Sequence, residues 1–182
     1  MPAKLLKDCV VLEEVTLPFV GNTKFVAEDF LCSKKTINTF SFIFGDIQDV
    51  TFGNLVQANS VRYDSDGTIE KNVLKGNYYI PKTLKKVVIL SGDIFDFAFR
   101  ECVGIEEIVL QGEGTTIRPQ AFAKCSDLKR IEFAESYVNF GAACFAAIAN
   151  PAEIIVQNAA QKSAIDNLAL DGITVKIANS VA

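Results

Sequence analysis

Hydrophobic positions recur along the chain at a spacing longer than any single helix or strand. Residues 98–110 read AFRECVGIEEIVL, and residues 121–133, 23 places later, read AFAKCSDLKRIEF. Each contains Ala-Phe, two variable residues, Cys, and apolar residues at the third, sixth and eighth places after Cys. We call this unit a rung and its Cys place the anchor. Because so short a unit cannot bury its own apolar face, the repeat predicts a solenoid of stacked units.

The same frame extends over most of the chain, with some degenerate copies. Cys9 is followed by Leu12, Val15 and Leu17, which matches every apolar place. Weaker rungs follow anchors at Lys34, with Ile37, Phe40 and Phe42 after it, at Pro81 and at Ile148. Anchors at 9, 34, 81, 102, 125 and 148 are separated by 25, 47, 21, 23 and 23 residues. The gap of 47 is about two periods and contains residues 45–79, which follow no clear rung.

Each rung has two apolar edges. Alternation in IEEIVL (105–110) predicts a strand whose sixth and eighth places face inward and whose seventh faces outward, paired in parallel with neighbouring rungs. The second edge is an apolar residue five places before the Phe of Ala-Phe, as at Ile94, Ile117 and Phe140, with Val26 in the same place. We expect one turn of α- or 3-10 helix at Ala-Phe-x-x-Cys.

The frame Ala-Phe-x-x-Cys-x-x-Leu-x-x-Ile-x-Leu, preceded by an Ile five residues before Phe, resembles the BspA-like leucine-rich repeats over residues 3–156. The resemblance implies a right-handed leucine-rich-repeat superhelix, with a parallel β-strand ladder and short helical or 3-10 turns. It also implies a surface or secreted protein of gut bacteria that binds a host or neighbouring-cell surface protein.

We expect one leucine-rich-repeat domain over residues 1–182. Residues 1–44 would hold repeats, 45–79 an irregular insertion or degenerate repeat, 80–156 regular repeats, and 157–182 a C-terminal cap. In the cap, NAAQKSAIDNLALDG predicts a helix that ends at Gly172, and ITVKI predicts a final strand. The chain starts inside a rung with no cap, which favours truncation from a longer protein.

Composition removes several classes of chemistry. The chain contains no histidine, so by itself it cannot form a Ser-His-Asp triad, a Cys-His dyad or a His-containing metal site. Its net charge is −4 and it has no basic stripe, which argues against nucleic-acid binding. No apolar run is long enough for membrane insertion. Carboxylate, lysine or Ser-Lys chemistry stays open by composition. Because the repeats account for nearly all apolar residues and leave no constellation of reactive groups, we expect a non-enzymatic protein without cofactor or metal; the sequence does not predict its oligomeric state.

The five cysteines are better explained by packing than by chemistry. Cys9, Cys102 and Cys125 share the anchor place, where a small apolar side chain packs well. The other two cysteines are Cys32 and Cys144. We predict that all five cysteines are free thiols. A bridge between Cys102 and Cys125 in adjacent rungs is the alternative.

YDSDGTIE (63–70) has two interpretations. Asp64, Asp66 and Glu70 supply oxygen ligands of the kind that calcium prefers, but Gly67 is at the wrong place for an EF-hand loop. We favour an ordinary Asp-Gly hairpin turn.

Outward-facing strand places supply the candidate binding residues. At the fifth place after the anchor, Lys86, Glu107 and Arg130 alternate in sign, as does Glu153 beyond them. Opposite charges facing each other on neighbouring strands attract, so this row either fixes the register of the rungs or forms a mixed-charge binding surface. At the seventh place, the β-branched residues either form an apolar contact patch or reflect strand propensity alone. These residues are Val88, Val109 and Ile155.

Three of the four tyrosines, Tyr63, Tyr78 and Tyr79, fall in the irregular segment, and tyrosine is favoured at interfaces because a rigid ring buries much area with a polar tip. We expect a protein-binding module that acts in adhesion at the cell surface or outside the cell, although a cytoplasmic location stays open. The alternative is a structural spacer within a larger surface protein.

Overall fold

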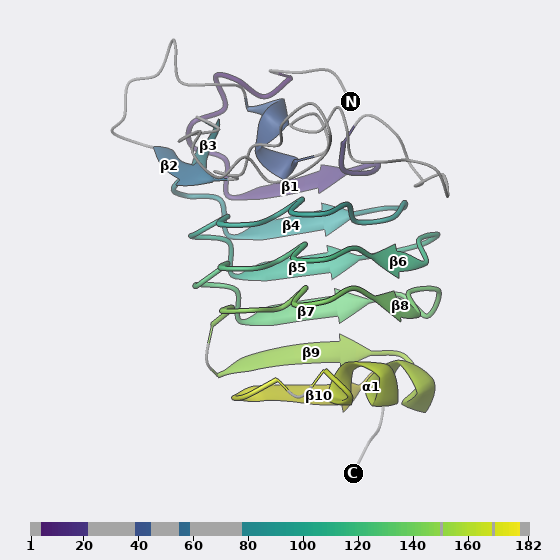
Figure 1. Cartoon of the computed structure of the whole chain (residues 1–182). Coiled ribbons are helices and arrows are strands. Elements are labelled where there is room, and N and C mark those ends of the chain that lie inside the picture. Colours follow the sequence, from purple (N-terminus) through teal and green to yellow (C-terminus); the bar gives the residue numbers. More distant parts are fainter. Residues whose placement is uncertain are drawn as a thin grey trace, which may run out of the picture.

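The main feature of the fold is one sheet of parallel strands stacked along the axis of a solenoid (Figure 1). The computed structural model describes residues 5–21, 39–44, 55–58, 78–149, 151–168 and 170–178. Every neighbouring pair of strands in this sheet is parallel. In spatial order the strands are β1 (Glu14–Leu17), β4 (Lys86–Ile89), β5 (Glu107–Leu110), β7 (Arg130–Phe133), β9 (Ala152–Val156) and β10 (Ile173–Ile177).

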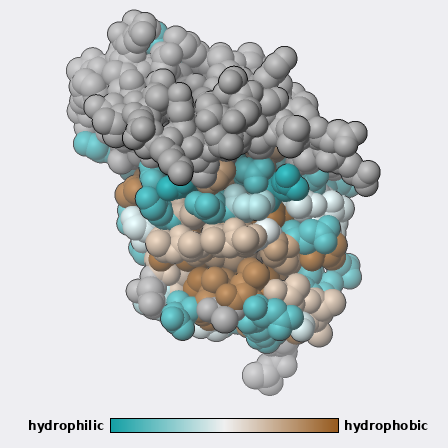
Figure 2. All heavy atoms as spheres, viewed as in Figure 1, coloured by the Kyte–Doolittle hydropathy of each residue, from teal (hydrophilic) through white to brown (hydrophobic). Residues whose placement is uncertain are grey.

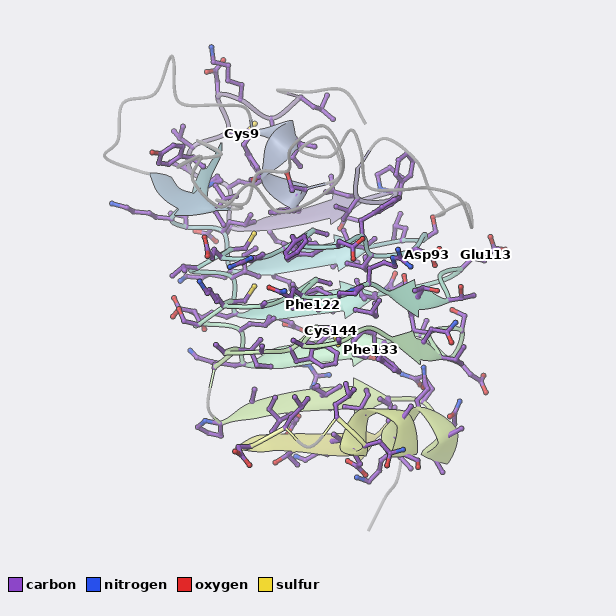
Figure 3. All side chains as sticks on the ribbon, in the orientation of Figure 1. Cys9, Asp93, Glu113, Phe122, Phe133 and Cys144 are labelled. Atoms are coloured by element: carbon purple, nitrogen blue, oxygen red, sulfur yellow. The ribbon has the colours of Figure 1, made fainter. Side chains whose placement is uncertain are left out.

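The inward places of each rung form the core, as the sequence predicts. In the rung that ends in β7, Leu128, Ile131 and Phe133 are at most 1% exposed. Phe122, from the turn of the same rung, packs behind the sheet (Figure 3). Each rung is covered by the next, and this stacking is why a short repeat can bury its apolar residues.

A second, narrower line of strands runs along the other edge of the solenoid. β6 (Thr116–Ile117) pairs in parallel with β8 (Asn139–Phe140), and Ile94 forms a bridge to Ile117. This arrangement confirms the extended piece predicted at Ile94, Ile117 and Phe140, whereas Val26 lies outside the described residues.

The turns between the two edges are not helical, contrary to our expectation for the Ala-Phe-x-x-Cys segment. Phe97 and Glu101 have φ near +60° (58° and 59°), outside the helical region. The N–H of Arg100 bonds to Phe97 within its own turn (3.0 Å), whereas the N–H of Phe99 bonds to Ala121 of the next coil (2.7 Å). In a helix every N–H would point along the helix axis. Here successive N–H groups bond alternately within their own turn and to the next coil, and the second set joins neighbouring turns.

The predicted rung anchored at Lys34 is wrong in its described part. Phe40–Ile43 form a 3-10 helix, η2, and not a strand. Phe40 stacks on Phe99 at 4.8 Å, and its N–H bonds to Ala98 (2.7 Å), so it occupies the turn place of the coil that ends in β4. The remaining residues of this rung before Thr39 lie outside the described residues.

β1 pairs directly with β4, which makes one coil far longer than the others. The paired residues Glu14 and Lys86 are 72 places apart (86 − 14), whereas Lys86 and Glu107 are 21 apart (107 − 86). This coil therefore contains about 50 additional residues. Within it, β2 (Leu55–Ala58) and β3 (Tyr78–Pro81) form an antiparallel pair outside the main sheet.

The C-terminal helix is shorter than predicted. α1 (Ala159–Asp166) begins after Asn158, whose side chain accepts from the N–H of Gln161 (2.9 Å). Leu168 and Leu170 pack against the core rather than continue the helix. Gly172, with a φ of 71°, belongs to the turn before β10 and does not end the helix. β10 confirms the predicted final strand.

Candidate functional site: the strand face

The outward side chains of the main sheet form two rows, which together we call the strand face. The first, the charged row, contains Glu14, Lys86, Glu107, Arg130 and Glu153. The second, the central row, contains Thr16, Val88, Val109, Glu132, Ile155 and Lys176. Both rows follow from strand alternation, since residues two places apart lie on the same face of the sheet.

Ion pairs run along the charged row, as the alternating signs predict. Arg130 contacts three carboxylates: Glu107 at 3.4 Å, Glu153 at 3.3 Å and Glu132 of the central row at 2.8 Å. At the N-terminal end of the row, Lys86 lies 3.6 Å from Glu14. The guanidinium of Arg130 thus ties three neighbouring strands together in one polar network.

A second set of pairs lies just before the strands begin. The carboxylate of Glu106 lies 3.2 Å from Lys85 and 2.8 Å from Lys129. Two hydrogen bonds lower the pKa of Glu106: the one from Lys129 has the larger effect, and the one from Lys85 the smaller. The hydrogen bond between Lys129 and Glu106 also raises the pKa of Lys129. All three side chains are solvated, so they shape the local potential more than they stabilise the fold.

The central row is less exposed than its sequence suggests. Val88 and Ile155 are each 8% exposed, and Val109 is half-buried. Parallel neighbours lie less than about 5 Å away on either side, so a β-branched side chain is shielded from both directions. The prediction of an exposed apolar patch therefore holds for Val109 in part and fails for the other two.

The structure places only some of the tyrosines. Tyr78 and Tyr79 are in β3, which leads into β4, and the side chain of Tyr79 is half-buried. The side chain of Tyr78 lies outside the described part of the structure, as does Tyr63. The candidate calcium loop, with Asp64, Asp66 and Glu70, also lies outside it.

The thiols are placed for packing rather than for reaction. Cys102, Cys125 and Cys144 are buried and are not in disulfides. Burial raises the pKa of Cys125 and Cys144 to about 12 and that of Cys102 well above its ordinary value. A thiolate is the nucleophile, so such thiols are inert near neutral pH. Cys9 is exposed, which corrects the expectation that every anchor cysteine is buried. It lies in the first coil, at one end of the stack (Figure 3). Cys32 lies outside the described residues.

Other kinds of site were sought in the described part of the chain. There, no three His, Cys, Asp or Glu side chains group closely enough to hold a metal ion. No helix in that part is long and apolar enough to cross a membrane.

Sequence reasoning missed both ends of the strand face. Glu14 occupies the fifth place after Cys9, but the false rung at Lys34 hid that it is the neighbour of Lys86. Lys176 of β10, which pairs with Glu153, follows no anchor at all. The repeat frame places Glu14 in the charged row, so its position could have been predicted from the sequence. The frame does not extend to Lys176, so the sequence offered no means of finding that residue.

Parallel strands repeated at this spacing define a leucine-rich-repeat solenoid. Residues 92–177 match the family model described as "BspA type Leucine rich repeat region (6 copies)", and this part of the chain belongs to that family. Members of the family are generally non-enzymatic, and their repeats typically mediate protein interactions. No curated protein and no solved structure matches the chain.

Proposed function

We propose that the chain is a protein-binding module and that the strand face is its contact surface. The observation that carries this proposal is the continuity of the two rows across successive parallel strands, in which Val109 lies two places after Glu107 on β5 and faces Glu132 of β7. Solenoids generally bind partners on the extended surface that stacked repeats create.

The charges of the strand face suggest how a partner is recognised. The charged row alternates in sign at every strand, so it offers no large field of one sign. Such a surface selects a partner whose charges alternate in the same register, because mismatched charges are repelled. We expect moderate affinity and partial sensitivity to salt.

We further propose that the protein works at the cell surface or outside the cell, in adhesion to a host or neighbouring-cell protein. The support for this is the BspA-type family, whose members are usually extracellular or surface proteins. Tyr63, Tyr78 and Tyr79 are proposed to extend the contact surface. The alternative role is a structural spacer in a larger surface protein.

A site-specific cross-linking experiment tests the contact surface. A photoreactive amino acid is placed at position 109 and, as a matched control, at the exposed Glu113 away from the strand face. After incubation with surface proteins of host or neighbouring cells, we expect a saturable product from position 109 only. The cross-linked protein is then produced in pure form and its Kd is measured.

Loss of binding in a folded Val109→Arg variant would support the strand face. Arg is chosen because Glu132 in the same row can accommodate a positive charge, so the variant should fold. Equal cross-linking from positions 109 and 113, or unchanged affinity of the variant, would contradict the strand face and favour the spacer.

A further inference from the structure

The last strand of the main sheet, β10, has one edge that no described strand pairs with. β10 stands at the end of the strand order, next to β9 alone. The carbonyl of Gly172 accepts from β9 (3.3 Å), and the N–H of Ala178 donates to β9 (2.6 Å). Because the backbone groups of a strand alternate in direction, the N–H and C=O groups of Ile173 and Val175 point away from β9. We call this side of β10 the free edge.

The free edge lacks the usual protection against another strand. Exposed edges are normally protected by charge, by proline or by a bulge. The sequence of β10, ITVKI, contains no proline, and its one charged side chain is that of Lys176. This side chain contacts Glu153 of β9, so it reaches back over the sheet and not across the free edge.

The apolar side of β10 is only partly covered. Ile173 and Val175 pack against the core but are half-buried, whereas the inward residues Ile131 and Phe133 of β7 are at most 1% exposed. A central coil has a neighbour on both sides, but β10 has a described neighbour on one side only. Figure 2 shows an apolar area toward this end of the molecule. A further strand at the free edge would complete the burial of this row.

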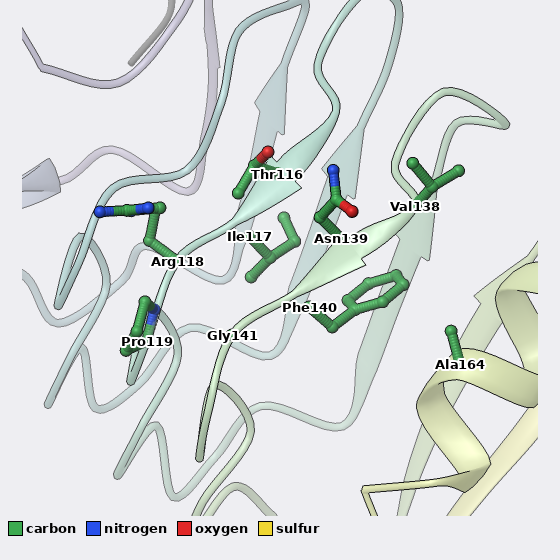
Figure 4. A pocket seen from close by; sticks show the side chains of 9 residues that line it. All are labelled: Thr116, Ile117, Arg118, Pro119, Val138, Asn139, Phe140, Gly141 and Ala164. Atoms are coloured by element: carbon green, nitrogen blue, oxygen red, sulfur yellow. The ribbon is translucent and has the colours of Figure 1, made fainter. Parts of the chain in front are cut away.

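α1 leaves a hollow on each of its two sides. The cavity between α1 and β8 has a volume of about 470 Å³, and its lining includes the polar side chains of Arg118 and Asn139 (Figure 4). The hollow between α1 and β10 is smaller, about 250 Å³, and it opens beside the free edge. It is lined by four apolar and two acidic residues, which are Ile165, Leu170, Ile173, Val175, Asp166 and Asp171. The second hollow therefore continues the apolar side of β10.

The free edge is complementary to a second copy of itself. When two copies of β10 run antiparallel, with Thr174 facing Thr174 of the second copy, Ile173 faces Val175 of the second copy. Each such pair exchanges two N–H···O bonds, because the backbone groups of both residues point outward. The two-fold axis repeats the pair, so one self-complementary contact satisfies all the outward groups of Ile173 and Val175.

Charge also favours the antiparallel arrangement. Asp166 and Asp171 line the same hollow as Ile173, so acidic residues lie at the N-terminal half of β10. Lys176 lies at its C-terminal end. Antiparallel pairing brings the basic end of each strand to the acidic end of the other, whereas parallel pairing would bring like charges together.

We propose that β10 is a dimerisation strand, along which two copies of the chain pair antiparallel about a two-fold axis at Thr174. The two sheets would then continue into each other, with both strand faces on the same side. This contact lies at the end of the solenoid and does not depend on the proposed function of the strand face.

Sedimentation of the whole chain in reductant tests the dimer. We expect the average mass to approach twice that of the chain as concentration rises. Val175→Pro removes one outward N–H and leaves the bonds to β9 in place, so it should raise the Kd of the dimer at least about tenfold, or about 1.4 kcal/mol. Val175→Ala keeps that N–H and is the control, which should weaken the dimer less. Val109→Arg, on the strand face, should dimerise as the wild type does.

A disulfide cross-link tests the register and does not require that Val175→Pro fold. Thr174→Cys is made in a chain in which Cys9 and Cys32 are Ser. Facing residues that are not hydrogen-bonded lie about 4.5 Å apart, within reach of a disulfide, so oxidation should give a linked dimer. Lys176→Cys is the matched control, since its two copies would lie about 13 Å apart and should not bridge.

A chain that stays monomeric up to millimolar concentration would overturn the proposal. So would an unchanged Kd in a folded Val175→Pro variant, or bridging from position 176 as efficient as from position 174. A mass that rises beyond two copies would also overturn it, because an open assembly requires β10 to pair with a different surface of the next chain.

Discussion

At the scale of the residue, the burial of a side chain depends on which coil it belongs to as well as on its place in the rung. Cys102 and Cys125, in central coils, are at most 1% exposed, whereas Cys9 has the same place in the first coil and is exposed. Stacking from both sides accounts for the difference, because a side chain in a central coil is covered above and below.

Leu128→Ala should destabilise the protein by about 2–5 kcal/mol, because it leaves a cavity in a packed core. Leu128 is 0% exposed and lies in a coil with neighbours on both sides. Urea unfolding followed by circular dichroism measures the loss. Leu5→Ala, at an exposed position in the first coil, is the control and should change stability by less than about 0.5 kcal/mol. A loss that small for Leu128 would contradict the rung assignment.

Buried thiols should make stability fall as pH rises above about 9. The folded pKa of Cys125 and Cys144 is about 12, against an ordinary value of 9.0. Between these values the unfolded chain releases a proton that the folded chain retains, so each thiol lowers stability by up to about 1.4 kcal/mol per pH unit. Urea midpoints at pH 8, 9 and 10 measure the slope.

The control for this prediction is Cys125→Val, which removes one titrating thiol and should make the slope shallower. An unchanged slope in this variant would mean that other groups cause the pH dependence. Counting thiols in denaturant without reductant should give five per chain, since we predict no disulfide; three or fewer would contradict that.

At the scale of the element, polar contacts hold neighbouring strands and the C-terminal helix in register. Arg130 joins carboxylates from β5, β7 and β9. Gln161 of α1, which is 1% exposed, donates to the carbonyls of Ala134 (2.8 Å) and Tyr137 (2.7 Å). The ion pairs of Arg130 are solvated, whereas the hydrogen bonds of Gln161 are buried. We therefore expect them to contribute differently to the free energy of unfolding.

Arg130→Gln should destabilise the protein by about 1 kcal/mol at low salt, because three carboxylates lose their shared partner. Lys162→Gln, which removes an exposed pair with Asp166 on α1, is the control and should cost no more than about 0.5 kcal/mol. Raising the salt concentration should shrink the Arg130 effect. A loss that does not depend on salt would indicate packing of the Arg130 stem rather than charge.

Gln161→Ala should destabilise the protein by about 1–3 kcal/mol, because the buried carbonyl of Tyr137 loses its side-chain donor and the carbonyl of Ala134 keeps only the N–H of Tyr137 (3.3 Å). Thermal unfolding measures the loss. Lys162→Ala, half-buried on the same helix, serves as the comparison and should lie within about 0.5 kcal/mol of the wild type. Similar values for both would mean that Gln161 does not fasten the helix.

At the scale of the whole molecule, the described coils share one continuous core. Phe40, Phe99, Phe122 and Phe145 stack in sequence with ring centroids 4.8, 5.4 and 5.8 Å apart. Each ring covers the next, and so no coil buries its core alone. The stability of one coil therefore depends on its neighbours.

The described coils should accordingly unfold in one transition. Circular dichroism of the strands and the exposure of the Cys125 thiol to a reagent should give the same urea midpoint. Leu128→Ala, in a central coil, should move both midpoints together. Separate midpoints would show that the coils unfold independently and would contradict the continuous core.

The sequence alone determined the repeat and the faces of its residues. A period of 23 residues with apolar sixth and eighth places has one physical solution, a stack in which each coil covers the next. Burial of Ile108 and Ile131 and the alternating row of Lys86, Glu107 and Arg130 follow directly from that period.

Only the tertiary structure decided which coils are neighbours. Phe40 fits an inward strand place by pattern, yet it stacks in the turn above Phe99, because an aromatic ring satisfies either place equally well. That ambiguity hid the direct pairing of β1 with β4 and the neighbour relation of Glu14 and Lys86.

Where the hydrogen bonds between turns end was likewise decided by tertiary structure. Local sequence fixes the shape of the turn at Ala143 and Ala147, but a missing partner is a property of the residues that follow in space. The chain forms β9 and α1 where another turn would have stacked, so the N–H groups of Ala143 and Ala147 have no backbone acceptor among the described residues.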